Sequence, residues 1–244
     1  MRAAVVAAVL WAASAQTAGL SDLRFHHLHL RDARPESRIA FYERLFDPTI
    51  RYRIAFGDAQ GLLTGTRRIL VSVATPGDKR PAALWHFGWG GVSLAETYLA
   101  HARSEVAWEP PLPPEALHVH LRSVSPTRAA AWYRDVLGAD VLVAQAAPQS
   151  REPLPPPEHR MPGALVTIGG LPLLIYPADR PLASSLGSGI DHVAFTCRDL
   201  DDTLASLRAR RVPILREPYL VDGVRAAIIQ GPDLIAIELL EADP

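Results

Sequence analysis

The alternation of apolar and polar positions predicts a chain of short strands with helices between them. In the segment 189–196, Val193 and Phe195 alternate with His192 and Ala194. Successive side chains of a strand point to opposite faces. This segment therefore predicts a strand with an apolar back, which packs on helices, and a small histidine-bearing front, which lines a cavity.

The same histidine-bearing strand design occurs four times, and each copy precedes a segment of helical periodicity. The first and third copies align without a gap, and the second and fourth align likewise, which is the signature of repeated supersecondary units. The strands are expected at His26–Leu30, Leu84–Gly88, Leu117–Leu121 and Gly189–Thr196, and the helices at about 35–46, 94–103, 126–138 and 199–210.

Three of the four units continue with three more strands, giving βαβββ units, whereas prolines follow the second helix almost at once. The predicted fold class is α+β with tandem βαβββ modules, in which the C-terminal pair is complete and the N-terminal pair is truncated. The predicted organisation is a signal peptide at 1–15, an N-terminal half at 20–108, a linker at 109–115 and a C-terminal domain at 116–244, for which the family resemblance given below implies a metal cup.

The first residues have the pattern of a secretory signal peptide. Arg2 precedes an apolar run, Ala3–Ala13, and Ala13-Ser14-Ala15 offers a small-x-small cleavage site before Gln16. The run is too short for a mature membrane anchor. We therefore expect a periplasmic or secreted protein without a membrane anchor after processing; a buried first helix is the alternative.

Composition narrows the class of partner. The 244 residues carry a formal net charge of -1, and the basic residues are scattered, so no electrostatic footprint for nucleic acid is present. The single cysteine, Cys197, excludes an internal disulfide and is expected to be a small packed residue. The expected partner is a small-molecule substrate, and the sequence leaves the oligomeric state undetermined.

Tandem βαβββ units with a histidine on the first strand resemble the vicinal oxygen chelate superfamily, which includes glyoxalase I, extradiol dioxygenases and bleomycin-resistance proteins. The resemblance is strongest at 116–133, 190–207 and 231–241. It implies that two units curl their sheets into a cup around a divalent metal. The metal ligands then come from the first strand of each unit and from the last strand.

Carried over residue by residue, the resemblance implies the metal ligands His118, His192 and Glu238. Glu238 shares its strand face with Ala236 and lies between apolar neighbours, where an unpaired carboxylate is costly. Taken singly, each residue is more often structural than ligating. Two histidines and one carboxylate with open positions suit Fe(II), Mn(II) or Zn(II).

The resemblance also implies catalytic roles for Glu238, Tyr176 and His120. Tyr176 stands where glyoxalase I-like members have a second carboxylate, and His120 faces the cup as a neighbour of the ligands or a substrate contact. His27 and His86 occupy the matching positions of the first half. Because that half lacks a final carboxylate, a remnant site is expected there, with a weak metal site as the alternative.

The expected function is that of an exported, divalent-metal-dependent enzyme of dioxygenase, lyase or isomerase type, acting on a small molecule with vicinal oxygens. The alternative is a metal-free protein that binds or sequesters a small molecule, as resistance proteins do. The segment 224–230 contains no His or Tyr, which speaks against extradiol ring cleavage. Arg225, Tyr219 and the loop 148–162 are candidate substrate contacts.

Overall fold

The structure, a computed structural model, describes residues 20, 22–45, 51–65, 67–74, 82–89, 117–144 and 161–242. The predicted signal peptide, second helix, linker and proline-rich loop lie outside these residues. Within them no helix is long and apolar enough to cross a membrane.

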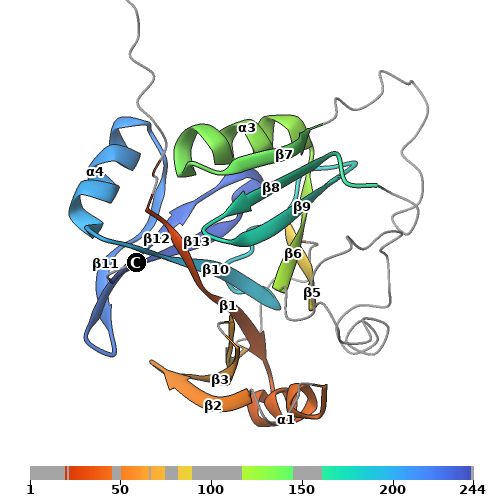
Figure 1. Ribbon diagram of the computed structural model, residues 1–244, viewed down its shortest axis with the longest axis vertical. Coiled ribbons are helices and arrows are strands. Elements are labelled where there is room, and N and C mark those ends of the chain that lie inside the picture. The colour runs from red at the N-terminus through yellow and green to blue at the C-terminus, as the bar shows by residue number, and fades with distance from the viewer. Residues whose placement is uncertain are drawn as a thin grey trace, which may run out of the picture.

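Strands dominate the described elements, and three helices separate groups of them (Figure 1). The first unit comprises β1 (Arg24–Asp32), α1 (Pro35–Leu45), β2 (Arg51–Phe56), β3 (Ala59–Thr64) and β4 (Arg67–Val73). The second contributes β5 (Leu84–Trp89). The third comprises β6 (Leu117–Ser123), α3 (Pro126–Leu137), β7 (Asp140–Ala144), β8 (Ala164–Ile168) and β9 (Leu171–Pro177). The fourth comprises β10 (Ile190–Cys197), α4 (Leu200–Ala209), β11 (Ile214–Val221), β12 (Val224–Gln230), the short 3-10 helix η2 (Pro232–Leu234) and β13 (Ala236–Glu241). The predicted α+β class is confirmed.

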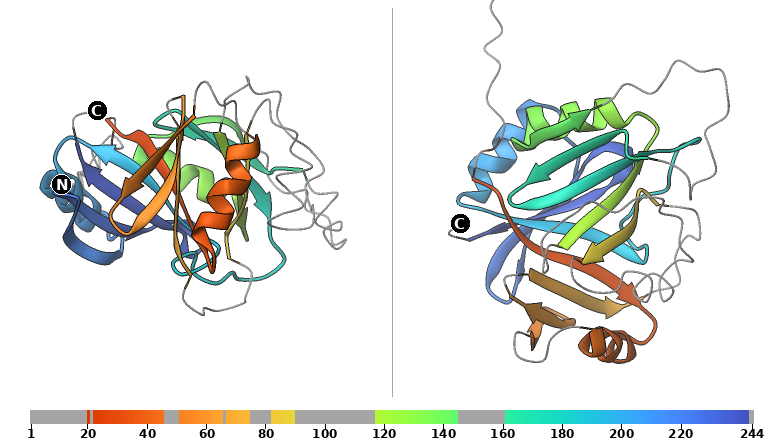
Figure 2. Two further views of the ribbon diagram at one scale, coloured as in Figure 1. Left: turned by 90° about the horizontal axis from the view of Figure 1, so that it is seen from below. Right: turned by 45° about the vertical axis from the view of Figure 1, so that its right-hand side comes forward.

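The strands form two sheets. Each sheet joins strands of two units, but the units are not the first with the second and the third with the fourth. The eight-stranded sheet has the order β11-β12-β13-β10-β1-β4-β3-β2, and the five-stranded sheet has the order β5-β6-β9-β8-β7. The first and fourth units therefore share one sheet through β1 and β10, which run antiparallel side by side (Figure 2). The second and third units share the other through β5 and β6.

The sequence predicts a metal cup within 116–244, and the strand order adds an earlier part of the chain to the cup around β10. The cup around β10 takes half of its wall from β1–β4, which precede the predicted linker. The physical reason is that the main chain of β10 is paired by β1 on one side and by β13 on the other. No edge of β10 is left for the third unit.

The alternation predicted for β10 holds in three dimensions. Val193, Phe195 and Cys197 are buried in the large apolar core, whereas Ala194 belongs to a separate small cluster. The helices pack on the strands: α1 packs on β3 and β4, α3 on β7, β8 and β9, and α4 on β12 and β13. The opposite face of β10 is therefore left for a cavity.

The eight-stranded sheet curls until the hairpins at its two ends meet. The amide of Gly57, in the β2–β3 turn, donates a hydrogen bond of 2.7 Å to Asp222 Oδ2 in the β11–β12 turn. Gly57 has a φ of +60°, and a Cβ atom there would lie 2.8 Å from Val221 Cγ2. The approach of the two turns therefore requires glycine at this position, and it closes the sheet into a cup.

Candidate metal centre

The cup encloses a cavity of about 500 Å³. Its walls come from the strands at the centre of the eight-stranded sheet and from the two hairpins that meet at its mouth. The polar residues that line it are His27, His29, Arg31, Asp58, Ser72, Asp191, His192, Arg216, Tyr219, Asp222 and Glu238. The first and fourth units thus contribute polar side chains to a single cavity.

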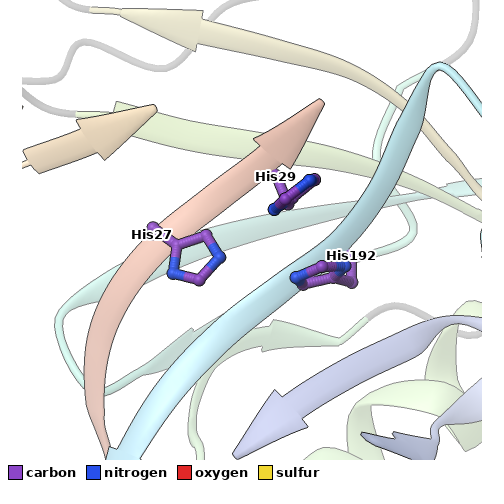
Figure 3. Close-up of side chains that lie close together, drawn as sticks. All are labelled: His27, His29 and His192. Carbon is purple, nitrogen blue, oxygen red and sulfur yellow. The ribbon is translucent and has the colours of Figure 1, made fainter. Parts of the chain in front are cut away.

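Three histidines gather at the base of this cavity (Figure 3). His27 and His29 come from β1, and His192 comes from β10 directly opposite His29. One ring nitrogen from each lies within 4.8 Å of the others. His27 and His192 are buried, with exposed fractions of 1% and 6%. The three imidazoles are therefore placed for a metal ion.

Glu238 adds a carboxylate to this group from β13. The residue lies opposite Ala194 of β10, two positions beyond His192. Its Oε2 is 3.5 Å from His27 Nε2 and 3.5 Å from His192 Nε2. Among the described residues these three buried atoms have no hydrogen-bond partner. Because buried polar atoms in proteins are normally hydrogen-bonded, such a convergent set is typical of a cation-binding site.

The second polar atom of each of these side chains is held by a neighbour. His192 Nδ1 donates to Asp191 Oδ1 over 2.6 Å, and His27 Nδ1 lies 2.8 Å from His26 Nδ1. Tyr219 donates its hydroxyl hydrogen to Glu238 Oε1. Metal-ligating histidines usually bind a partner through the ring nitrogen that faces away from the metal. The arrangement leaves one free donor atom on each side chain.

The spacing and chemistry of these atoms fit a divalent ion. Ligands about 2.1 Å from one tetrahedral ion are roughly 3.4 Å apart, close to the 3.5 Å separations around Glu238 Oε2. Imidazole nitrogen with one carboxylate oxygen suits Zn(II), Fe(II) or Mn(II). His29 is the fourth candidate ligand; its Nε2 also lies 2.9 Å from Ser72 Oγ.

The two carboxylates around His192 determine its charge. Burial opposes a charged imidazole, but the hydrogen bond to Asp191 and the nearby Glu238 outweigh it and raise the pKa of His192 to about 9. Burial acts to raise the pKa of Glu238, but His192 and Tyr219 outweigh it, and the net shift is downward. The metal-free site therefore holds a proton on His192 beside an ionised Glu238.

The two histidines of β1 are neutral instead. Burial, followed by the charge of His192, lowers the pKa of His29 to about 3. The same two causes hold the pKa of His27 well below its ordinary value. Neutral imidazoles have a lone pair available for a metal without first losing a proton.

The structure brings together two of the three predicted ligands and places the third in the other sheet. His192 and Glu238 meet as expected. His118 lies on β6, in the five-stranded sheet, and is not in the histidine group of β1 and β10. His27 lies beside His192 instead, and His86, its expected partner in a remnant site, lies on β5 in the five-stranded sheet.

The predicted catalytic residues His120 and Tyr176 lie with His118 in the five-stranded sheet, apart from Glu238. The rings of His120 and Tyr176 stack at a centroid distance of 5.3 Å. The ring of His86, on β5, meets that of His120 edge-on at 4.7 Å. The sheet order therefore separates these aromatic side chains from the cavity that holds Glu238.

Sequence reasoning missed His29 and Asp191 as residues of this centre. The cluster His26-His27-Leu28-His29 was visible, and two histidines with a spacing of two in a strand share a face. Asp191 was hidden because neighbours in a regular strand point apart. Of the candidate substrate contacts, Tyr219 lines the cavity, whereas Arg225 forms ion pairs with Asp201 and Glu241.

Comparisons with known proteins agree with this architecture. The fold and the site define a protein of tandem βαβββ units with candidate metal ligands in a cup. Residues 116–239 match the family model described as the Glyoxalase/Bleomycin resistance protein/Dioxygenase superfamily. The match covers just over half of the chain, which therefore belongs to this superfamily.

Solved structures of similar fold cover nearly the whole chain. Glyoxalase I from Zea mays superposes with a TM-score of 0.59 and 16% identity, covering 90% of this chain and 92% of that one. A mutant of the same enzyme gives a TM-score of 0.58, 15% identity and coverages of 90% and 94%. These likenesses establish the fold alone. A search of curated proteins found no match.

Proposed function

We propose that this protein is a divalent-metal-dependent enzyme that acts on a small molecule with vicinal oxygens. The observation that carries the proposal is the convergence of His27 Nε2, His192 Nε2 and Glu238 Oε2, three buried atoms without hydrogen-bond partners among the described residues. In a cavity of about 500 Å³, such a centre leaves room for a substrate beside the ligands.

The chain's own residues would divide the work as follows. His27, His192 and Glu238 hold the ion, with His29 next to them, and a bound ion supplies a Lewis acid for two neighbouring oxygens of a substrate. Tyr219 keeps Glu238 Oε1 occupied, so that Oε2 is the oxygen offered to the cavity. Arg31 and Arg216 are the cations of the cavity wall.

A metal-free binding protein is the competing function, and the burial of Glu238 disfavours it. The carboxylate is 4% exposed, and isolated buried charge is expensive unless it is paired or coordinates a metal. Without a metal, the protonated His192 would compensate this charge from 3.5 Å, but the neutral His27 would still direct its Nε2 at the same oxygen, as a second metal ligand would.

Metal analysis tests the proposal directly. Purified protein is dialysed against Zn(II), Mn(II) or Fe(II), freed of excess metal, and analysed by plasma mass spectrometry. We expect close to one ion per chain for wild type and loss of the ion in the His192→Ala variant. Wild type that retains no ion above the level of His192→Ala would overturn the proposal.

The matched control is His118→Ala. It removes an equally buried histidine from the corresponding first strand of the third unit. We expect this variant to keep the ion, which would separate loss of a ligand from general loss of packing.

Export is proposed separately, on the signal-peptide pattern of Arg2, Ala3–Ala13 and Ala13-Ser14-Ala15. N-terminal sequencing of protein from the periplasm or medium should begin at Gln16. Full-length chain recovered only from the cytosol would contradict this part of the proposal.

A further inference from the structure

Asp191 and His192 are neighbours in β10, yet their side chains meet. In the pairing of β10 with β1, His29 lies opposite His192 and Leu30 lies opposite Ile190, which leaves Asp191 as an extra residue. An extra residue of this kind is a β-bulge, and bulges redirect side chains next to functional sites. The bulge explains how Asp191 can bind its own neighbour.

The Asp191 carboxylate is fixed at both oxygens. Oδ2 accepts a hydrogen bond of 2.6 Å from the Gly187 amide and lies 3.5 Å from Arg31 Nη1. Oδ1 accepts the 2.6 Å hydrogen bond from His192 Nδ1. The side chain is almost fully enclosed, with the residue 3% exposed. One oxygen therefore anchors the carboxylate, and the other is directed at the imidazole.

This contact determines which nitrogen of His192 faces the cavity. A carboxylate accepts hydrogen bonds, so Nδ1 carries the hydrogen and the lone pair of the neutral ring belongs to Nε2. Nε2 is the atom that lies 3.5 Å from Glu238 Oε2. Second-sphere carboxylates of this kind fix the tautomer and orientation of a ligating histidine and raise its basicity.

The histidines of the other described strands are not preceded by a carboxylate residue. The residues that precede His86, His118 and His120 are Trp85, Leu117 and Val119. For His27, Nδ1 is met by the His26 ring and not by a carboxylate. A carboxylate in the position directly before the histidine therefore distinguishes His192 from these histidines.

A second comparison shows what Asp191 replaces. Glu238 lies opposite Ala194, two residues beyond His192, and Leu70 lies opposite His29, two residues beyond His27. Leu70 thus occupies in the first unit the position that Glu238 occupies in the fourth. The centre has one carboxylate where its two-fold arrangement has room for two.

We propose that Asp191 is the positioning residue of the metal centre. It orients His192 through Nδ1 and supplies, through the imidazole, the second negative charge that the Leu70 position lacks. The inference rests on the proposed function, because it assigns a role toward the metal that His27, His192 and Glu238 would hold.

The test measures metal binding and the state of the His192 ring in Asp191→Asn, Asp191→Ala and wild type. Zn(II) affinity is measured by competition with a coloured chelator, and the ring nitrogens of His192 are observed by NMR in the Zn(II)-loaded protein. We expect Asp191→Ala to bind Zn(II) about 10- to 100-fold more weakly. Asp191→Asn, which keeps an acceptor oxygen but loses the charge, should fall between the two and retain the Nδ1-protonated ring.

The control is Asp32→Asn. Asp32 also binds a backbone amide, that of Arg34, and an arginine, Arg38, but it lies outside the cavity. The Asp32→Asn variant should bind Zn(II) as tightly as wild type. Asp191→Asn has the size of the native residue, so a folded variant is available even if Asp191→Ala does not fold.

The possible failures are distinguishable. Wild type that loads no metal would overturn both the proposed function and this inference. Wild type that loads metal, with both Asp191 variants binding it as tightly, would overturn the inference alone. Equal losses in Asp191→Asn and Asp32→Asn would also overturn it, because the effect would then be one of general stability.

Discussion

The two sheets of this protein share one strand design but differ in the residue that lies beside the histidines. In each, the first strands of two units pair antiparallel and carry buried histidines: His27 and His192 in one sheet, His86 and His120 in the other. In the eight-stranded sheet these histidines surround a carboxylate. In the five-stranded sheet, the residue in that position, counted from His118, is Leu174.

The register makes the comparison direct. Glu238 lies opposite Ala194, two residues beyond His192. Leu174 lies opposite His120, two residues beyond His118. One sheet thus has an ionised group between its imidazoles, and the other has an apolar side chain in the matching position. The difference teaches that histidine-bearing strands supply a scaffold, while the carboxylate on the last strand decides whether the scaffold can hold a cation.

The largest expected effect comes from Glu238→Gln. The substitution keeps the size of the side chain but removes the negative charge that offsets a divalent ion, so we expect at least about a 100-fold loss in Zn(II) affinity. Tyr176→Phe, which changes a polar residue on the last strand of the third unit in the other sheet, is the control and should leave the affinity unchanged. Chelator competition on both variants measures this, and equal affinities would remove the distinction between the sheets.

Comparing His27→Ala with His118→Ala tests which sheet supplies the histidine ligands. His27 Nε2 is 3.5 Å from Glu238 Oε2, so its removal should cost tight metal binding, at least about tenfold. His118→Ala should have no such effect. If His118→Ala loses the ion and His27→Ala keeps it, the metal belongs to the five-stranded sheet.

The affinity for metal should rise with pH. In the metal-free protein the pKa of His192 is raised from 6.5 to about 9, so a metal must displace a proton from this ring. We expect about a tenfold gain in affinity per pH unit from about pH 7 up to about pH 9, and then a plateau. Calorimetry in buffers of different ionisation enthalpy should show one proton released per ion, and a pH-independent affinity would contradict the assignment.

The same shift has an opposite effect on the metal-free fold. A folded-state pKa above the unfolded value stabilises the protein fully below about pH 6.5, and this contribution is lost as the pH rises through about 9. Thermal unfolding without metal should therefore occur at a lower temperature above about pH 9. Added metal should reverse that trend, because it takes the place of the proton.

The smallest expected effect is that of Tyr219→Phe. Losing the hydroxyl frees Glu238 Oε1 from its hydrogen bond, which should weaken metal binding by about tenfold without abolishing it. Tyr133→Phe, which removes a buried phenol outside the cavity, is the control. A metal affinity for Tyr219→Phe equal to that of this control would show that the hydroxyl does not hold the ligand.

Local pattern predicted the strands well because burial on one face imposes a period of two. Val193 and Phe195 lie in the core and His192 faces the cavity, as alternation required. Glu238 was found for the same reason, as a carboxylate among apolar neighbours. These features depend on a few adjacent residues, and the chain carries them in its immediate sequence.

The partner of His192 could not be predicted in this way. Whether β10 pairs with β1 or with β6 depends on contacts between segments far apart in the chain, and histidines occur in both candidate strands. The bulge at Asp191 is likewise a product of the pairing register. The unusual density of histidines at 26–29, compared with the other strands, was the one local sign that favoured β1.

The pairing of β1 with β10 has a consequence for how the protein is made. β1 is synthesised early and β13 late, so an emerging chain holds His27 long before Glu238 exists to meet it. Contacts between such distant segments form slowly, since a long loop must close first. Metal occupancy would then report that the last strand has docked, and a chain interrupted before β13 would carry its histidines without the carboxylate that completes the site.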